Sequence, residues 1–293
     1  MPSARYRFRS EPLELDDQAR QTAPGCFMQL PDGIVHYELA GPPDGQPVVL
    51  VHGFSVPYFI WEPTFAALSQ AGLRLLRYDL YGRGFSDRPD LAYTHELYDR
   101  QLTGLLAALN IDAPVDLIGL SMGGPLVASF TSRHPERVRR VCLIDPAGFP
   151  QARPALSGLI TVPWLGELLM DLLAEKILVA GLKGDLHNPQ AFPDYAEKYR
   201  SQMVYRGFRR ALLSTLRHDV LVDNTPFYQH IDRLGKPVLL IWGRYDSVVP
   251  FKISELARAA MPHAVFHAID DAGHIPHYEK PQIVNSLILD FLR

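Results

Sequence analysis

A serine in a glycine-rich turn is the first residue that the sequence marks as a candidate for catalysis. An apolar run that starts at Val115 ends at Gly119-Leu120-Ser121-Met122-Gly123, and a sequence typical of a helix follows. This order predicts a strand, a sharp turn and a helix, although an ordinary glycine-rich turn would read similarly. Gly119 and Gly123 lack a Cβ, so the strand and the helix can pass close together. The hydroxyl would lie at a helix N-terminus, which favours the oxyanion that a serine nucleophile creates.

A serine hydroxyl becomes a nucleophile only when a base removes its proton and an acid orients that base. Asp246 follows the apolar run 238–242, and His274 follows the run 264–269. Both residues therefore come directly after predicted strands, as Ser121 does. We expect the carboxyl ends of these strands to bring Ser121, Asp246 and His274 to one edge of a sheet.

Other residues compete for these roles. Asp145 also follows a predicted strand, but Pro146 directly after it fits a structural turn. His277 lies three residues after His274 and could replace it as the base. His263 and His267 are spaced as metal ligands can be, but no third ligand accompanies them. The sequence therefore predicts neither a metal nor a cofactor.

The elements that must position these residues follow from hydrophobic patterning. The expected strands are 26–30, 34–40, 47–51, 73–78, 115–120, 138–144, 238–242 and 264–269, and the expected helices are 61–71, 95–109, 125–130, 253–261 and 282–292. Strands and helices in alternation predict a mostly parallel sheet with helices on both faces. Residues 149–234 break the alternation with helical patterning alone, so we expect an insertion at the carboxyl edge of the sheet.

The domain boundaries and the bulk composition complete this picture. We expect an α/β core of 25–148 and 235–293, a helical insertion of 149–234, and a loosely held extension of 1–24.

The chain has 293 residues and a net charge of −3, which gives no electrostatic footprint for nucleic acid. No apolar segment reads as a signal peptide or a bilayer span. The two cysteines fit a reducing compartment, so the expected location is cytoplasmic, and the oligomeric state is left open.

Five stretches together resemble the α/β-hydrolase superfamily, from about Met28 to the C-terminus. They are His52-Gly53-Phe54-Ser55, Asp79-Leu80-Tyr81-Gly82-Arg83-Gly84-Phe85-Ser86, Gly119-Leu120-Ser121-Met122-Gly123-Gly124, Gly243-Arg244-Tyr245-Asp246, and Gly273-His274-Ile275-Pro276-His277-Tyr278-Glu279-Lys280-Pro281. Their order along the chain is that of the family.

The resemblance implies a role for each matching position. Ser121 would be the nucleophile, His274 the base and Asp246 the acid. The backbone N–H groups of Phe54 and Met122 would form the oxyanion hole. The 79–86 stretch would be a structural turn, and the 149–234 insertion would be a helical cap over the pocket.

The resemblance also narrows the chemistry. Family members that cleave haloalkanes or epoxides carry an aspartate where Ser121 stands, so a serine implies acyl transfer. We expect a carboxylesterase for short to medium acyl chains, with monoacylglycerols as possible substrates. The alternatives are a carbon–carbon bond hydrolase of meta-cleavage type, an enol-lactonase, a perhydrolase, or a binding protein that has lost hydrolysis. The expected partner is a small-molecule ester.

Overall fold

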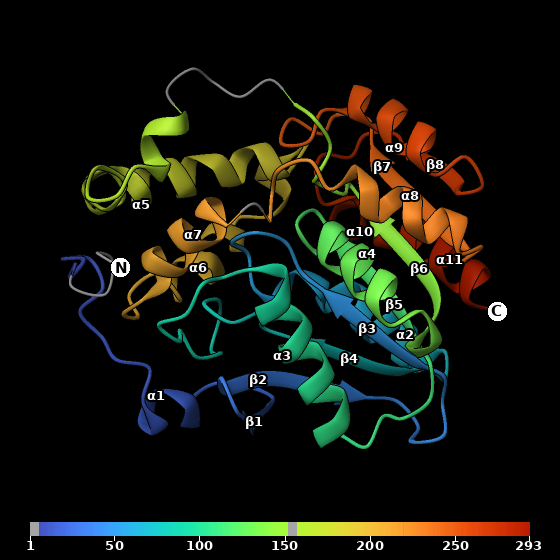
Figure 1. Ribbon diagram of the computed structural model, residues 1–293, viewed down its shortest axis with the longest axis horizontal. Helices are drawn as coiled ribbons and strands as arrows, with labels where there is room; N and C mark the ends of the chain where they lie inside the picture. The colour runs from blue at the N-terminus through green and yellow to red at the C-terminus, as the bar shows by residue number, and fades with distance from the viewer. Residues whose placement is uncertain (1–5, 152–156, 219) are drawn as a thin grey trace.

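Eight strands form one sheet at the centre of the computed structural model, which describes residues 6–151, 157–218 and 220–293 (Figure 1). The strands are β1 (Cys26–Leu30), β2 (Gly33–Ala40), β3 (Pro47–Val51), β4 (Arg74–Tyr78), β5 (Val115–Leu120), β6 (Val138–Ile144), β7 (Val238–Gly243) and β8 (Val265–Ile269). Their spatial order is β1-β2-β4-β3-β5-β6-β7-β8. The β1–β2 and β2–β4 pairs are antiparallel, and the other pairs are parallel.

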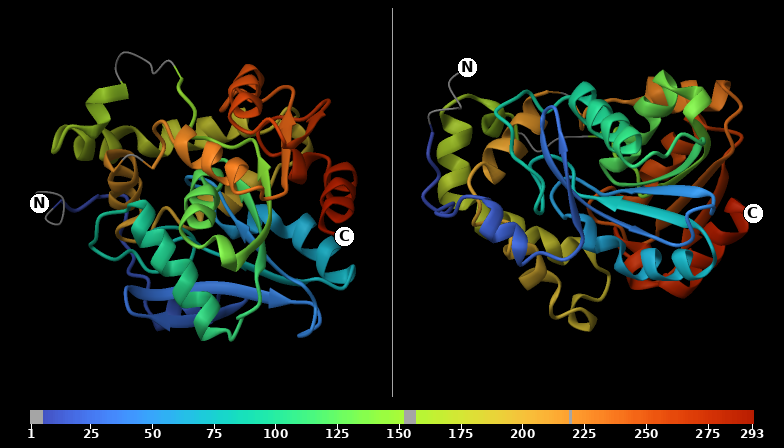
Figure 2. Two further views of the ribbon diagram at one scale, coloured as in Figure 1. Left: turned by 45° about the vertical axis from the view of Figure 1, so that its right-hand side comes forward. Right: turned by 90° about the horizontal axis from the view of Figure 1, so that it is seen from below.

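Helices cover both faces of this sheet (Figure 2). In chain order the α-helices before residue 149 or after residue 220 are α1 (Asp17–Gln21), α2 (Glu62–Gln70), α3 (His95–Ala108), α4 (Gly123–Arg133), α8 (Thr225–Arg233), α9 (Ser254–Ala260), α10 (Pro276–Glu279) and α11 (Pro281–Leu292). Buried side chains of α3, α4, α8 and α9 pack on one face, and those of α2 and α11 pack on the other. The predicted mostly parallel sheet with helices on both faces is therefore confirmed.

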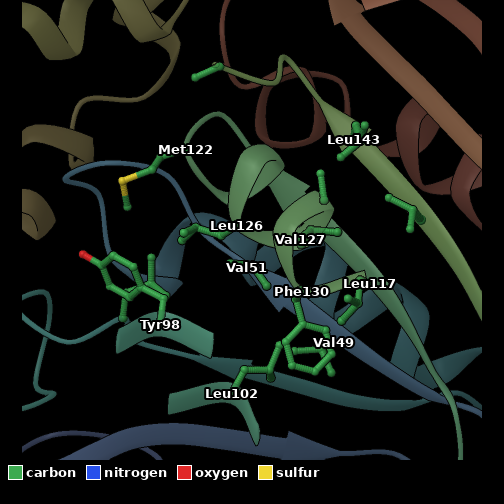
Figure 3. Close-up of a cluster of buried hydrophobic side chains, with 14 of the residues drawn as sticks. Val49, Val51, Tyr98, Leu102, Leu117, Met122, Leu126, Val127, Phe130 and Leu143 are labelled. Carbon is green, nitrogen blue, oxygen red and sulfur yellow. The ribbon is translucent and has the colours of Figure 1, made fainter. Parts of the chain in front are cut away.

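Strand β3 shows why the apolar runs fold as they do. All five of its residues are buried, and alternate side chains point to opposite faces of the sheet. Val49 and Val51 pack against α3 and α4, where Leu102, Leu126 and Phe130 meet them (Figure 3). Val48 and Leu50 belong to the cluster under α2 and α11. A strand covered on both faces needs a continuous apolar sequence, which is what the chain supplies at 47–51.

A helical segment separates β6 from β7, as the sequence predicts. It contains the helices η4 (Ser157–Thr161), α5 (Leu165–Asp185), η5 (Pro189–Ala191), α6 (Tyr195–Arg200) and α7 (Phe208–Arg217), here called the inserted helices. Figure 1 shows α5, α6 and α7 gathered at the left of the molecule. Helix α8 follows them and packs on α4, within the layer that covers the sheet.

The N-terminal segment differs from the loosely held extension expected. Glu11 is buried, and its carboxylate accepts hydrogen bonds from the backbone N–H groups of Gly207 (2.7 Å) and Arg209 (2.7 Å). These groups lie at the start of α7, where a negative charge is favourable. Leu13 also forms a bridge with Tyr205. The described part of the segment is thus fastened to the inserted helices by contacts that a polar, irregular sequence does not reveal.

In the part of the chain that the structure describes, no helix combines the length and the apolar character needed to cross a membrane.

Candidate active site

Ser121 lies in a strained turn between β5 and α4. Its φ of 52° is in the left-handed region, which costs a residue with a side chain about 1–3 kcal/mol. Backbone hydrogen bonds hold the turn: the N–H of Ser121 donates to Ile144 (3.0 Å), and its C=O accepts from Gly124 (2.9 Å) and Ala147 (3.0 Å). Strain that the surroundings enforce in this way is typical of functional positions.

The two glycines beside Ser121 are required by close backbone approach. A Cβ on Gly119 would lie 2.5 Å from the carbonyl oxygen of Gly123, and a Cβ on Gly123 would lie 2.3 Å from that of Val51. Neither distance is possible without a shift of the backbone. The structure thus supplies the physical reason for the spacing that singled out Ser121.

His274 and Asp246 meet, as the sequence predicts. Nδ1 of His274 lies 2.8 Å from Oδ2 of Asp246, and both residues are buried. The other oxygen of Asp246 accepts hydrogen bonds from the backbone N–H groups of Val248 (2.8 Å) and Val249 (2.9 Å). The carboxylate is therefore fixed, and it orients the imidazole with Nε2 left for another partner.

The surroundings of His274 favour its protonated form. Burial lowers its pKa, but the charge and hydrogen bond of Asp246 and the charge of Asp185 outweigh burial, so the pKa is raised above 6.5.

Asp145, the competing acid, lies beside Asp246 and does not replace it. One side-chain oxygen or nitrogen atom from each of Asp145, Asp246 and His274 lies within 4.8 Å of the others, but the oxygen that accepts the imidazole N–H belongs to Asp246. Asp145 is fully buried, and its Oδ1 accepts the N–H of Gly243 (2.9 Å). Burial and the neighbouring charge of Asp246 raise the pKa of Asp145 well above its usual value.

The other histidines lie away from this chemistry. His277 is fully buried against the ring of Trp61, at 4.4 Å between ring centroids, and burial lowers its pKa to about 3. The His263 side chain is exposed and pairs with Asp232 at 3.0 Å. Among the described residues, His263 and His267 join no cluster of three potential metal ligands.

The two backbone N–H groups expected to form the oxyanion hole come from two separate segments of the chain. Met122 directly precedes α4, whereas Phe54 lies in the loop after β3. Among the described residues, the N–H groups of Phe54 and Met122 donate to no acceptor within the protein. Two free N–H groups beside Ser121 are what an oxyanion hole requires.

Buried side chains hold the Phe54 loop. Nε2 of His52 accepts the N–H of Leu80 (2.9 Å), so Nδ1 carries the proton and donates to the C=O of Gly53 (2.9 Å). Burial lowers the pKa of His52 to about 4, which keeps it neutral. Arg83 donates through Nε to the C=O of Phe54 (2.8 Å).

Comparison with known proteins identifies the family. A family model described as the alpha/beta hydrolase fold matches residues 46–281. The chain belongs to the alpha/beta hydrolase family. It is similar to 2-hydroxymuconate semialdehyde hydrolase of Pseudomonas putida, with 30% identity over 262 residues that cover 85% of this chain and 88% of that protein.

Solved structures give the same fold for this hydrolase. An enol-lactonase from Burkholderia xenovorans LB400 matches with a TM-score of 0.78 and 24% identity, covering 91% of this chain and 99% of that one. A thermophilic esterase from Thermogutta terrifontis matches with a TM-score of 0.77 and 24% identity, covering 92% and 98%. At this identity the likeness shows the fold and leaves the substrate open.

A cavity of about 120 Å³ joins the sheet edge of this hydrolase to the inserted helices. Ser121 and His274 both line it. The rest of the lining is Gly53, Phe54, Ser55, Val56, Ile60, Leu120, Asp185, Tyr195, Val248 and Ile275. The cavity is small beside the roughly 300–1,000 Å³ of typical ligand pockets.

Sequence reasoning missed the acidic residues around this cavity. Asp185 ends α5 and lines the cavity. Glu279 accepts hydrogen bonds from the backbone N–H groups of Gly273 (2.6 Å), His187 (2.8 Å) and Asn188 (3.2 Å). Glu279 therefore links two segments: the loop that contains His274, and the turn that follows α5 in the inserted helices. Glu279 stands within the last of the five family stretches, whereas no pattern marks Asp185.

Proposed function

We propose that this hydrolase cleaves small carboxylic esters through an acyl-enzyme on Ser121. The observation that carries the proposal is the His274–Asp246 hydrogen bond of 2.8 Å at a cavity that Ser121 also lines. The free N–H groups of Phe54 and Met122 support an oxyanion hole. The inserted helices serve as the cap over the pocket.

The reaction follows from these roles. Nε2 of His274 takes the hydroxyl proton while Oγ of Ser121 bonds to the ester carbonyl carbon. The oxyanion collapses, the carbon–oxygen bond to the alcohol breaks, and His274 returns the proton to the departing alkoxide. Water then attacks the acyl-enzyme by the same route and releases the carboxylic acid. Asp246 stabilises the imidazolium that forms in each half-reaction.

The size of the cavity sets the expected substrate range. Apolar walls stabilise an acyl chain by about 0.8 kcal/mol per buried methylene until the space is full. We expect kcat/KM to rise over the shortest acyl chains, peak early and fall for long ones. The measurement is kcat/KM across p-nitrophenyl esters of increasing length, with emulsified triolein as a further substrate. A maximum at the longest chain, or faster turnover of the emulsion, would indicate a lipase instead.

A carbon–carbon bond hydrolase is the second candidate, because the Pseudomonas putida relative is named for a muconate semialdehyde. A muconate carries a carboxylate, and a cationic side chain would be expected to bind it. Among the described residues no lysine or arginine lines the cavity, whereas Asp185 does. This lining favours a neutral ester over an anionic dienoate.

Two experiments separate the candidates. A fluorophosphonate probe should label Ser121, and absence of labelling would favour a protein that only binds ligands. Side-by-side assays of short esters and a dienone-type substrate should show ester turnover. Cleavage of the dienone without ester hydrolysis would overturn the proposed activity.

A further inference from the structure

We propose that Asp185, held by Tyr195, is a substrate-binding residue that selects esters carrying a hydrogen-bond donor, a hydroxyl or an ammonium group, close to the scissile carbonyl. The inference rests on the proposed esterase function and names its substrate class. Asp185 is the last residue of α5 and lines the same cavity as Ser121 and His274.

One oxygen of the Asp185 carboxyl is occupied and the other is free. Oδ2 accepts the hydroxyl of Tyr195 at 2.9 Å. Burial and the neighbouring Asp185 raise the pKa of Tyr195 well above its usual value, so the phenol keeps its proton and remains a donor. Oδ1 has no hydrogen-bond partner in the part of the chain that the structure describes. Asp185 is half-buried, and its free oxygen, which lines a mostly apolar cavity, can accept a hydrogen bond from a donor on the substrate.

The position of Asp185 relative to the catalytic loops is fixed on two sides. The hydroxyl of Ser247, next to Asp246, donates to the C=O of Gly184 at 3.0 Å. On the other side, the backbone of residues 185–187 packs so closely on Gly273 that a Cβ there would lie 2.7 Å from the C=O of Asp185. These contacts hold the end of α5 against both loops, so the carboxyl has a defined place with respect to His274.

Asp185 is also in an unfavourable place for stability. It is the last residue of the 21-residue helix α5, where the helix dipole disfavours a negative charge. Burial raises its pKa to about 6, against the opposing effects of His274 and the Tyr195 hydrogen bond. An acid at a helix C-terminus beside an apolar cavity costs stability, and residues placed at such a cost are candidates for a functional role.

The substrate test compares isosteres that differ in one donor. On the acyl side the pair is the p-nitrophenyl ester of 3-hydroxybutyrate and that of 3-methylbutyrate. On the alcohol side 2-hydroxypropyl acetate is compared with isobutyl acetate, and 2-(dimethylamino)ethyl acetate with 3-methylbutyl acetate. We expect the wild type to prefer the donor-bearing member of at least one pair by about tenfold or more in kcat/KM, as a hydrogen bond to a charged group provides.

Two variants test whether Asp185 causes the preference. Asp185→Leu should bring the preference ratio close to one for every pair. Asp185→Asn, which keeps an acceptor but no charge, should lose most of the ammonium preference and keep more of the hydroxyl preference. Tyr195→Phe should weaken both preferences. Glu175→Gln, which removes a charge from an exposed position of the same helix, is the matched control and should leave the ratios unchanged.

A pH profile separates this role from a structural one. The charges facing His274 come from Asp246 and Asp185, with Asp145 and Glu279 near them and the phenol of Tyr195 neutral. Asp185→Asn removes a charge that raises the pKa of His274, so the acid limb of kcat/KM should move to lower pH while the melting temperature stays equal or rises.

The outcomes also separate this proposal from the proposed function. Wild type that hydrolyses esters but shows equal kcat/KM within every pair, or ratios that survive Asp185→Leu, would overturn the role of Asp185. Wild type that hydrolyses no ester and is not labelled at Ser121 would instead overturn the proposed function.

Discussion

At the scale of single residues, Ser121 is the position on which turnover depends most. Ser121→Ala removes the hydroxyl that we propose forms the acyl-enzyme, so we expect nearly all activity to be lost, with a residual rate enhancement on the order of 10³–10⁴ over the reaction in water. The backbone conformation of the turn is unchanged by alanine, so stability should stay within about 1 kcal/mol of the wild type. Steady-state kinetics and thermal unfolding measure the two effects, and near-normal turnover would contradict the mechanism.

The two neighbouring acids should respond very differently to the same change. Asp246→Asn exchanges the carboxylate that orients His274 for an amide, which can favour the wrong tautomer of the imidazole and lower the rate by about 10⁴. The carboxylate bonded to the imidazole is Asp246, whereas Oδ1 of Asp145 accepts the N–H of Gly243, and Asn keeps a side-chain oxygen that can accept the same N–H. We expect Asp145→Asn to retain most activity. A crippled Asp145 variant beside an active Asp246 variant would reverse the assignment.

At the scale of elements, Glu279 connects the loop after β8 to the end of α5. Its carboxylate accepts from Gly273 on one side and from His187 and Asn188 on the other. Glu279→Gln leaves one oxygen to serve both sides, so a backbone N–H loses its partner, at about 1.5–3 kcal/mol for a bond to a charged group.

We expect Glu279→Gln to lower kcat by about tenfold and to lower the melting temperature, because the His274 loop loses its anchor. Glu255→Gln, at an exposed position of α9, is the control. Kinetics that match those of the control would mean that the loop is held by other contacts.

At the scale of the whole molecule, burial and charge together set the pH at which the protein works. Only the neutral imidazole of His274 can accept the serine proton. Because the pKa of His274 is raised above 6.5, activity should be lost on the acid side as pH falls through a value higher than 6.5, and should be fully present well above it. The pH dependence of kcat/KM measures this limb. A rate that stays flat from pH 5 to 8 would contradict a histidine base.

The sequence determined the sheet, because strand, turn and helix are encoded over neighbouring residues. The predicted runs 47–51 and 138–144 are strands with those same bounds, and the remaining predicted strands agree within one residue. Ser121 could be found in the same way, since its glycines are required by local approach of β5 and α4. Asp246 and His274 could be found because each directly follows a strand whose carboxyl end meets the same edge.

Only the tertiary structure decided which groups face the cavity from the inserted helices. Asp185 and His274 are separated by 89 positions in the sequence, and no local period relates a helix end to a distant loop. The same holds for Glu11, which looks like an ordinary polar residue until its contacts with the start of α7 are seen. The environment also decided that the pKa of Asp145 is raised, because a pKa depends on burial and on the charges that folding brings near. Local patterns position the backbone, whereas packing between distant segments sets the chemistry of the pocket.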